Sequence, residues 1–246
     1  MTGLLLAVLL FTADNALIPE ESAEEFATDC MYRLVGLLKT ETTTIDREAA
    51  AALRAALQPN SVVLKKSPCK WKSVCCDHGY AVNTISWRCH YHMGYAATPL
   101  GFLRLCWLPS TIQELSLYDY HRADIDRLNV RNFPRESRFV TLFQCGLKGT
   151  VETAALPKLL ERLSLKGNFL SGTVHLVSLP EKLKRLYMSE NPIHTLYVDT
   201  ESLSTHFVHA SFGSKKSRLQ ERPINVFSLS GPLDGRFEVK NARYIL

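Results

Sequence analysis

The feature that most constrains the fold is an internal repeat in the middle of the sequence. A proline that follows Leu or Phe recurs at intervals of 25, 23 and 23 residues, at Pro109, Pro134, Pro157 and Pro180. Each proline begins a segment that can be aligned to the pattern L-x-x-L-x-L-x-x-N/C-x-L, in which a short repeat is one structural coil. Two segments fill every position, with Leu160, Leu163, Leu165, Asn168 and Leu170 in one, and Leu183, Leu186, Met188, Asn191 and Ile193 in the other.

The spacing of this pattern has a physical explanation. The L-x-L core forms a short strand whose alternate side chains point inward, and the Asn bonds backbone groups that the following turn leaves unpaired. One coil cannot bury its apolar face alone, but stacked coils bury a continuous core. The sequence therefore predicts an α/β solenoid, a leucine-rich-repeat horseshoe arc with short parallel strands on its concave face.

The ends of the chain depart from the repeat. We predict a signal peptide over residues 1–16, a helical N-terminal cap with a first strand over 17–98, repeats over 99–215, and an irregular C-terminal cap over 216–246. Within this division, a degenerate fifth coil places Phe207, Ala210 and Phe212 in the core. Residues 219–246 lose the register, and their apolar residues predict two short strands on either side of the Gly231–Gly235 turn.

The leader prediction depends on the apolar run from Leu4 to Phe11, which is typical of the central segment of a secretory signal. The alternative is a retained, buried N-terminal helix. This is the longest apolar run in the chain, and it is much shorter than the roughly 20 residues that a membrane-spanning helix needs. We therefore expect no transmembrane span.

Composition and charge exclude further classes. With 46% apolar residues the chain is not wholly disordered. Its net charge of +5 comes from interspersed basic and acidic residues, whereas nucleic-acid binders gather Lys and Arg on one face. We therefore expect no nucleic-acid partner.

A second motif lies before the repeats, where a predicted helix is followed by the pattern C-x-W-x-x-V-x-C-D over residues 69–77. This arrangement resembles the N-terminal cap of plant-type extracellular leucine-rich-repeat proteins. The repeats carry the short motifs L-P and G-T-V, and they resemble leucine-rich-repeat proteins of kinetoplastid protists, some of which are surface antigens. The resemblance implies a disulfide between Cys69 and Cys76, and it implies that Trp71 packs on the first coil.

A rival interpretation of the same region is a metal site. Potential zinc ligands crowd into a short stretch, namely Cys69, Cys75, Cys76, His78, Cys89, His90 and His92. The usual C-x2–4-C pair is absent from it, so we predict no metal and no cofactor, and keep a zinc-stapled nucleic-acid-binding module as an alternative. Cys145 occupies the Asn position of its repeat and is expected to be a buried thiol.

The sequence contains none of the common catalytic motifs, such as G-x-S-x-G, H-E-x-x-H or a phosphate-binding glycine loop. Repeat solenoids present extended binding faces. We therefore predict a protein that is not an enzyme.

Binding should then involve side chains that point outward beside the inward leucines. Aromatic and basic residues at these positions are enriched in binding hot spots. The predicted binding residues are Tyr118, Phe139, Phe143, Arg162, Lys166, Arg185 and Tyr187. The alternative is a solvated sheet face, or one that the C-terminal segment covers.

Together these observations predict a secreted or cell-surface leucine-rich-repeat module that binds a protein, or a glycan, through its concave sheet. The main alternative is an intracellular repeat scaffold in which residues 1–16 stay as a helix and all cysteines are reduced.

Overall fold

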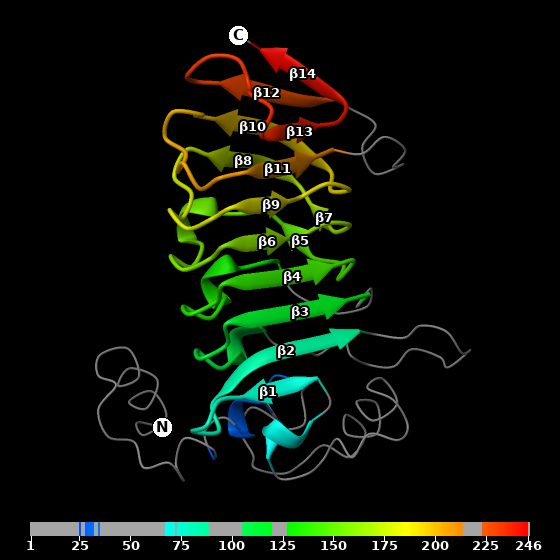
Figure 1. Cartoon of the computed structure of the whole chain (residues 1–246). Coiled ribbons are helices and arrows are strands. Elements are labelled where there is room, and N and C mark those ends of the chain that lie inside the picture. Colours follow the sequence, from blue (N-terminus) through cyan, green and yellow to red (C-terminus); the bar gives the residue numbers. More distant parts are fainter. Residues whose placement is uncertain are drawn as a thin grey trace, which may run out of the picture.

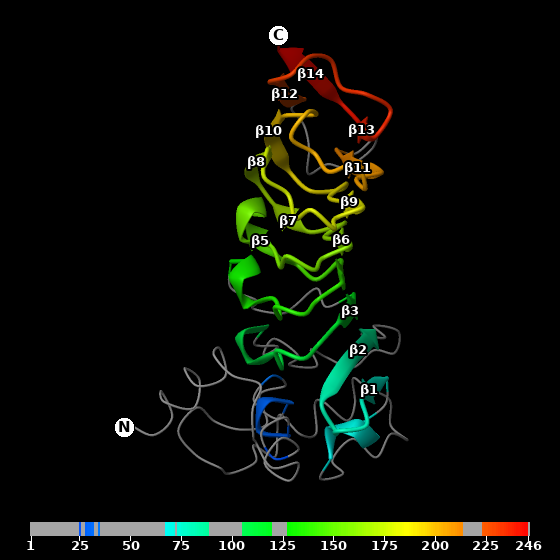
Figure 2. The same cartoon turned by 60° about the vertical axis from the view of Figure 1, so that its left-hand side comes forward.

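A computed structural model of the chain shows a column of stacked coils (Figure 1). Figure 2 shows the same column turned by 60°, with two sheets on different sides of it. The predicted solenoid of parallel strands is confirmed, whereas the curvature of a horseshoe stays a prediction. The structure describes residues 25, 28–31, 34, 67–71, 73–88, 105–119, 127–213 and 223–245.

The larger sheet runs the length of the column. It has eight strands in the order β1-β2-β3-β4-β6-β9-β11-β13, and all of its neighbouring pairs are parallel except β1 with β2. One strand per coil joins this sheet, as the repeat predicts. The strands are β1 (Val74–Cys76), β2 (Val82–Arg88), β3 (Glu114–Tyr118), β4 (Phe139–Phe143), β6 (Arg162–Ser164), β9 (Arg185–Tyr187), β11 (His209–Phe212) and β13 (Phe237–Val239).

A second parallel sheet of four strands lies behind the first in the upper coils (Figure 1). It has the order β14-β12-β10-β8, and a two-stranded sheet of β5 and β7 precedes it along the column. Their bounds are β5 (Lys148–Gly149), β7 (Phe169–Leu170), β8 (Gly172–Leu176), β10 (Ile193–Val198), β12 (Ile224–Ser228) and β14 (Ala242–Ile245). The G-T-V motif of the third coil thus begins a strand, because Gly172 opens β8.

Short 3-10 helices, rather than long α-helices, connect several of the strands. Three of them, η2 (Leu105–Trp107), η3 (Val130–Asn132) and η4 (Thr153–Ala155), follow one another up the column. The fourth, η1 (Pro68–Lys70), precedes β1.

The core consists of the repeated apolar positions. Leu115, Val140, Leu163, Leu186 and Ala210 are aligned with one another through the register of β3, β4, β6, β9 and β11. All five are fully buried. The predicted fifth-coil core is also confirmed, since Phe207 and Phe212 are buried beside Ala210.

Two core residues differ from the residue that the repeat pattern has at their position, and both carry a hydrogen-bond donor. Ser137 stands where the pattern has Leu, and its buried hydroxyl donates to the Ile112 carbonyl of the coil before, at 3.2 Å. Cys145 stands where the pattern has Asn, and its buried thiol lies 3.4 Å from the Phe143 oxygen and 3.5 Å from the Leu117 oxygen. A small donor at each position thus gives a core carbonyl a side-chain hydrogen bond.

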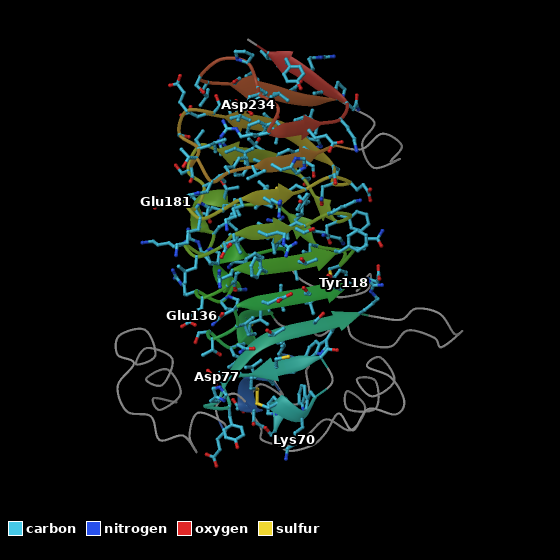
Figure 3. The ribbon with its side chains drawn as sticks, in the orientation of Figure 1. Lys70, Asp77, Tyr118, Glu136, Glu181 and Asp234 are labelled. Carbon is cyan, nitrogen blue, oxygen red and sulfur yellow. A yellow bond between two sulfur atoms is a disulfide. The ribbon has the colours of Figure 1, made fainter. Side chains whose placement is uncertain are left out.

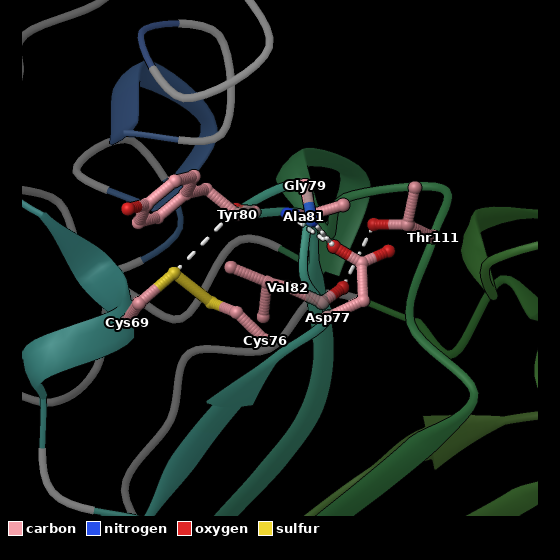
Figure 4. Close-up of a disulfide and its surroundings, with 8 residues drawn as sticks. All are labelled: Cys69, Cys76, Asp77, Gly79, Tyr80, Ala81, Val82 and Thr111. Carbon is pink, nitrogen blue, oxygen red and sulfur yellow. Dashed lines mark hydrogen bonds between the residues drawn. A yellow bond between two sulfur atoms is a disulfide. The ribbon is translucent and has the colours of Figure 1, made fainter. Parts of the chain in front are cut away.

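The N-terminal end of the large sheet is a hairpin of β1 and β2 (Figure 4). Cys69 and Cys76, the two cysteines that the resemblance pairs, form a disulfide that joins η1 to β1. The Asp77 carboxylate accepts hydrogen bonds from the backbone of Gly79 and Ala81, at 2.9 and 3.0 Å, which holds the hairpin turn. The hairpin adds β1 to the large sheet as an antiparallel strand, which the sequence did not predict.

Aromatic packing joins this end to the first coil. Trp71 and Trp87 are both buried, and their ring centroids lie 6.4 Å apart in a stacked arrangement. Helical residues Met31 and Leu34 also belong to the core. The contact of Trp71 with β2 agrees with the packing that the resemblance implies.

At the other end, residues 223–245 continue the column although the sequence of residues 219–246 loses the repeat pattern. Phe237 pairs in register with Ala210, and Ala242–Ile245 pairs with β12, so residues 223–245 add strands to both sheets. The two predicted strands form, as β12 and β13, but they join different sheets and do not pair with each other. Backbone hydrogen bonds propagate a coil even where its side chains no longer match the repeat.

Several predictions concern residues outside the described part of the chain. They are the signal peptide (1–16), most of the N-terminal cap, and the potential zinc ligands Cys89, His90 and His92. The boundaries of the predicted domains stay predictions.

Candidate functional site

The outward face of the large sheet carries the predicted binding residues. Inward positions of β4 are buried, and outward positions are partly exposed, because side chains alternate along a strand. Parallel register then places outward residues of successive coils side by side. Tyr118 lies beside Phe143, and Phe139 lies beside Arg162, which lies beside Arg185. Six of the seven predicted residues belong to β3, β4, β6 and β9, and Lys166 follows β6 directly.

One row of this face lies at the carboxyl ends of the strands. The Tyr118 and Phe143 ring centroids are 6.4 Å apart. The Arg88 guanidinium lies 4.8 Å from the Tyr118 centroid, and the Lys166 ammonium lies 6.0 Å from the Phe143 centroid. Two cations thus bracket two aromatic rings, an arrangement that cation–π attraction stabilises. Figure 3 shows the side chains of this face, with Tyr118 labelled at the end of β3.

A second row lies at the amino ends of the same strands. Two guanidiniums lie near the Phe139 ring, with Arg138 at 5.6 Å and Arg162 at 5.3 Å from its centroid. Farther along the column, Tyr187 of β9 contacts His209 of β11, with ring centroids 5.4 Å apart. We call this surface, composed of the two rows with Arg185, Tyr187 and His209, the aromatic–basic face.

Three members of the aromatic–basic face were not among the predicted residues. They are Arg88, Arg138 and His209. Arg88 and His209 pair in register with Tyr118 and Arg185. Extending the repeat pattern to β2 and β11 would have identified Arg88 and His209, but the sequences of these two strands match the pattern poorly.

Ion pairs neutralise most of the basic residues around this face. Glu161 bonds both Arg138 and Lys184, the latter at 2.7 Å, and its side chain is only 13% exposed. Lys166 lies 3.3 Å from Glu190, and Arg88 lies 3.9 Å from Asp119. The hydrogen bonds from Lys184 and then Arg138 lower the pKa of Glu161, so this carboxyl stays ionised.

A separate aromatic stack lies on the four-stranded sheet. His175, Tyr197 and Phe227 occupy aligned positions on β8, β10 and β12. Their ring centroids are 5.1 and 4.8 Å apart, and the rings are nearly parallel. Rings stacked face to face at the strand spacing present mainly their edges to solvent.

The structure also bears on the metal interpretation. Cys69 and Cys76 are joined to each other, so neither is a thiolate that could bind zinc. Among the residues that the structure describes, no three His, Cys, Asp or Glu side chains come together as a metal site. Cys75 and Cys106 are exposed thiols.

No described helix is long and apolar enough to cross a membrane.

No protein-family profile and no curated protein matches the sequence. Among solved structures, the chain is similar to the leucine-rich-repeat ectodomain of the receptor kinase SOBIR1 from Arabidopsis thaliana. The identity is 17% and the TM-score is 0.38, over 79% of this chain and 97% of that one.

Proposed function

We propose that the chain is a non-enzymatic protein-binding module that contacts its partner through the aromatic–basic face. The residues proposed to make this contact are Tyr118, Phe139, Phe143, Arg162, Lys166, Arg185 and Tyr187. This face is the sequence-predicted concave surface of a leucine-rich-repeat protein. A glycan is the second ligand class, because aromatic rings and guanidiniums also bind sugars.

The observation that supports this proposal most is the partial exposure of the rings. Tyr118, Phe139, Phe143 and Tyr187 stay partly accessible on one continuous sheet face. No described helix or strand crosses in front of β3, β4, β6 and β9 (Figure 1). Residues 223–245 extend the column instead of folding back over this face. Aromatic and Arg side chains in such a position are typical of interface hot spots.

The proposal includes no catalysis. Among the residues that the structure describes, the carboxyls with shifted pKa values are Glu161, Asp199 and Asp234, and each pKa is lowered by hydrogen bonds from neighbouring side chains or backbone groups. Carboxylates held ionised in this way serve structural ion pairs and turns, whereas a general acid or base needs a pKa closer to neutral pH.

We further propose that the protein works outside the cell or on its surface. The disulfide between Cys69 and Cys76 is a bond that persists in oxidising compartments, and the apolar leader over residues 1–16 suits secretion. Expression with the leader in a secreting eukaryotic host, followed by intact mass and thiol counting, tests this part. Secreted protein that has lost the leader and holds one disulfide is expected. An intact N-terminus with all cysteines reduced would favour the intracellular scaffold.

The binding proposal is tested with two matched double variants. Phe143→Ala with Arg162→Ala removes one ring and one cation from the aromatic–basic face. Phe227→Ala with Lys182→Ala removes the same kinds of group elsewhere on the column. Both variants and the wild type are screened against an array of purified secreted and cell-surface proteins, and the affinity of each partner found is then measured by calorimetry.

We expect partners that bind the wild type to bind the face variant at least about tenfold more weakly, which is about 1.4 kcal/mol. The control variant should bind normally, and circular dichroism should show all three proteins folded. Partners that bind the face variant as tightly as the wild type, or an array without any partner, would contradict the proposal.

A further inference from the structure

We infer that Arg162 and Arg185 form a subsite for an acidic group on the protein partner, a carboxylate or a phosphorylated side chain. This inference rests on the proposed function, because it assigns chemistry to one part of the aromatic–basic face. It says that the partner presents an anionic residue next to apolar ones.

The two arginines are direct neighbours. They pair in register across β6 and β9 and point to the same outward side of the sheet. Neighbouring strands are about 4.8 Å apart, so the two side chains leave the sheet close to each other. Both residues are exposed. The next outward pair along the same strands is Ser164 with Tyr187, which also register with each other.

The charge around this pair differs from that around the other basic residues of the face. Arg88, Arg138, Lys166 and Lys184 each have a carboxylate within 4.0 Å. Within the described part of the chain, neither Arg162 nor Arg185 has an ion pair. Like charges directly opposite each other in a sheet are destabilising, so the fold retains a repulsive pair that an anionic ligand would neutralise.

The donors at this position suit an oxyanion. Two guanidiniums supply forked N–H donors that match carboxylate and phosphate oxygens, and the Ser164 and Tyr187 hydroxyls can each donate one more hydrogen bond. Arg162 also lies 5.3 Å from the Phe139 ring centroid, which restricts where its guanidinium can go. A partly fixed donor loses less entropy when it binds.

The surroundings favour a protein segment over a nucleic acid. Glu161 and Glu190 lie among the basic residues of this face and are ion-paired there. A phosphate backbone would need an uninterrupted row of cations, whereas one or two acidic side chains need only this pair. Phe139 and Phe143, on the adjacent strand β4, would then contact apolar neighbours of the acidic residue.

The test uses short fluorescein-labelled peptides of three kinds, alternating Leu with Asp, with phosphoserine, or with Asn. Binding to the full chain is measured by fluorescence anisotropy at low and high salt. Arg162→Glu with Arg185→Glu reverses the charge of the subsite. Lys158→Glu with Lys182→Glu gives the same change in net charge at exposed positions in the same two coils.

We expect the Asp or phosphoserine peptide to bind, and the stronger of the two identifies the source of the anion. The arginine variant should weaken that binding at least about tenfold, and the lysine variant by no more than about twofold. Added salt should weaken wild-type binding as well. An Asn peptide that binds as tightly as the acidic ones, equal effects of the two variants, or the absence of binding by both acidic peptides would overturn the subsite.

A third variant separates this inference from the proposed function. Tyr118→Ala with Phe143→Ala removes apolar contact without changing charge. If it weakens binding of a partner while the arginine variant does not, the aromatic–basic face binds but the anion subsite is wrong. If neither variant changes binding of a partner, the proposed function is wrong as well.

Discussion

Asn168 and Asn191 donate to the same backbone oxygen, the carbonyl of Leu165, at 2.8 and 2.9 Å. The two residues lie one coil apart and are fully buried. The Asn168 side-chain oxygen also accepts from the backbone of Cys145 and Leu147, at 2.9 and 3.1 Å. Each asparagine therefore ties its own coil to the one before it, and the shared oxygen makes the two links interdependent.

This relationship predicts the effect of removing the asparagines. Asn168→Ala leaves buried backbone groups without partners and should lower the free energy of unfolding by about 1–3 kcal/mol. Asn191→Ala should have a similar effect. The double variant removes both donors to the Leu165 oxygen, so we expect a non-additive cost of about 0.5 kcal/mol or more. Urea unfolding measures all three, with the exposed Gln113→Ala as control. Near-wild-type stability of Asn168→Ala would contradict the buried hydrogen bonds described for this side chain.

Gly213 occupies a backbone conformation that side chains rarely adopt, with φ of +74°. A Cβ there would lie 2.0 Å from the Lys240 oxygen. Gly213→Ala should therefore lower the free energy of unfolding by about 2 kcal/mol or more, from left-handed strain and overpacking together. Gly235→Ala is the control, because a Cβ there meets nothing within 4 Å. Equal thermal stability of the two variants would show that β13 does not pack on β11 in this way.

The disulfide between Cys69 and Cys76 closes a loop with a sequence separation of 7. Replacing both cysteines by Ser should lower the free energy of unfolding of the N-terminal hairpin by about 2 kcal/mol. Hydrogen exchange in β1 and β2 measures this effect locally. Cys75→Ser should leave exchange unchanged, because Cys75 is exposed and outside the bond. If the Cys75 variant has the larger effect, the pairing is different from the one described.

Glu161 makes the stability of the large sheet depend on pH. Because Lys184 and Arg138 lower its pKa in the folded protein, its contribution is complete above the ordinary carboxyl value of about 4.3. The contribution is lost as the pH falls through the lower folded value. We expect wild type to be more stable than Glu161→Gln at neutral pH, and the difference to shrink in acid. A difference that is constant with pH in urea unfolding would contradict the ion pairs.

The repulsion between Arg162 and Arg185 also has a consequence for stability. Arg185→Gln removes it while keeping most of the side chain, and should raise the free energy of unfolding by about 0.2–1 kcal/mol at low salt. The gain should disappear at high salt, where charges are screened. The control is Lys182→Gln, which is expected to change little. A loss of stability in Arg185→Gln at low salt would mean that this arginine has a stabilising partner.

The turns after the strands show where local sequence is insufficient. Asp119, Gln144 and Glu190 follow their strands in a left-handed conformation, with φ between 50° and 65°. Gly167 occupies the same place in its coil. A glycine in the sequence indicates such a conformation, but a Gln or Glu does not, because residues other than glycine usually avoid it. The stacking of adjacent coils imposes the turn whichever residue is present.

The sequence alone determined the stacked coils, the strands that their repeats contribute to the large sheet and most of the residues that line the core. It could do so because each coil contacts only its neighbours, so that leucine and asparagine positions repeat along the chain at a fixed interval. It also placed six of the seven predicted binding residues at outward positions of β3, β4, β6 and β9, since alternation along a strand is a local property.

Only the tertiary structure decided the features that depend on contact between coils. The four-stranded sheet and the extension of both sheets through residues 223–245 come from backbone hydrogen bonds, which are independent of side-chain type. The sharing of the Leu165 oxygen requires the side chains of Asn168 and Asn191 to meet from two coils. The same is true of the charge pattern. Glu161 pairs with Arg138 and Lys184 from the coils on either side, whereas Arg162 and Arg185 meet each other. Which charges are neutralised is decided in three dimensions, because an ion pair requires two side chains to reach the same point in space.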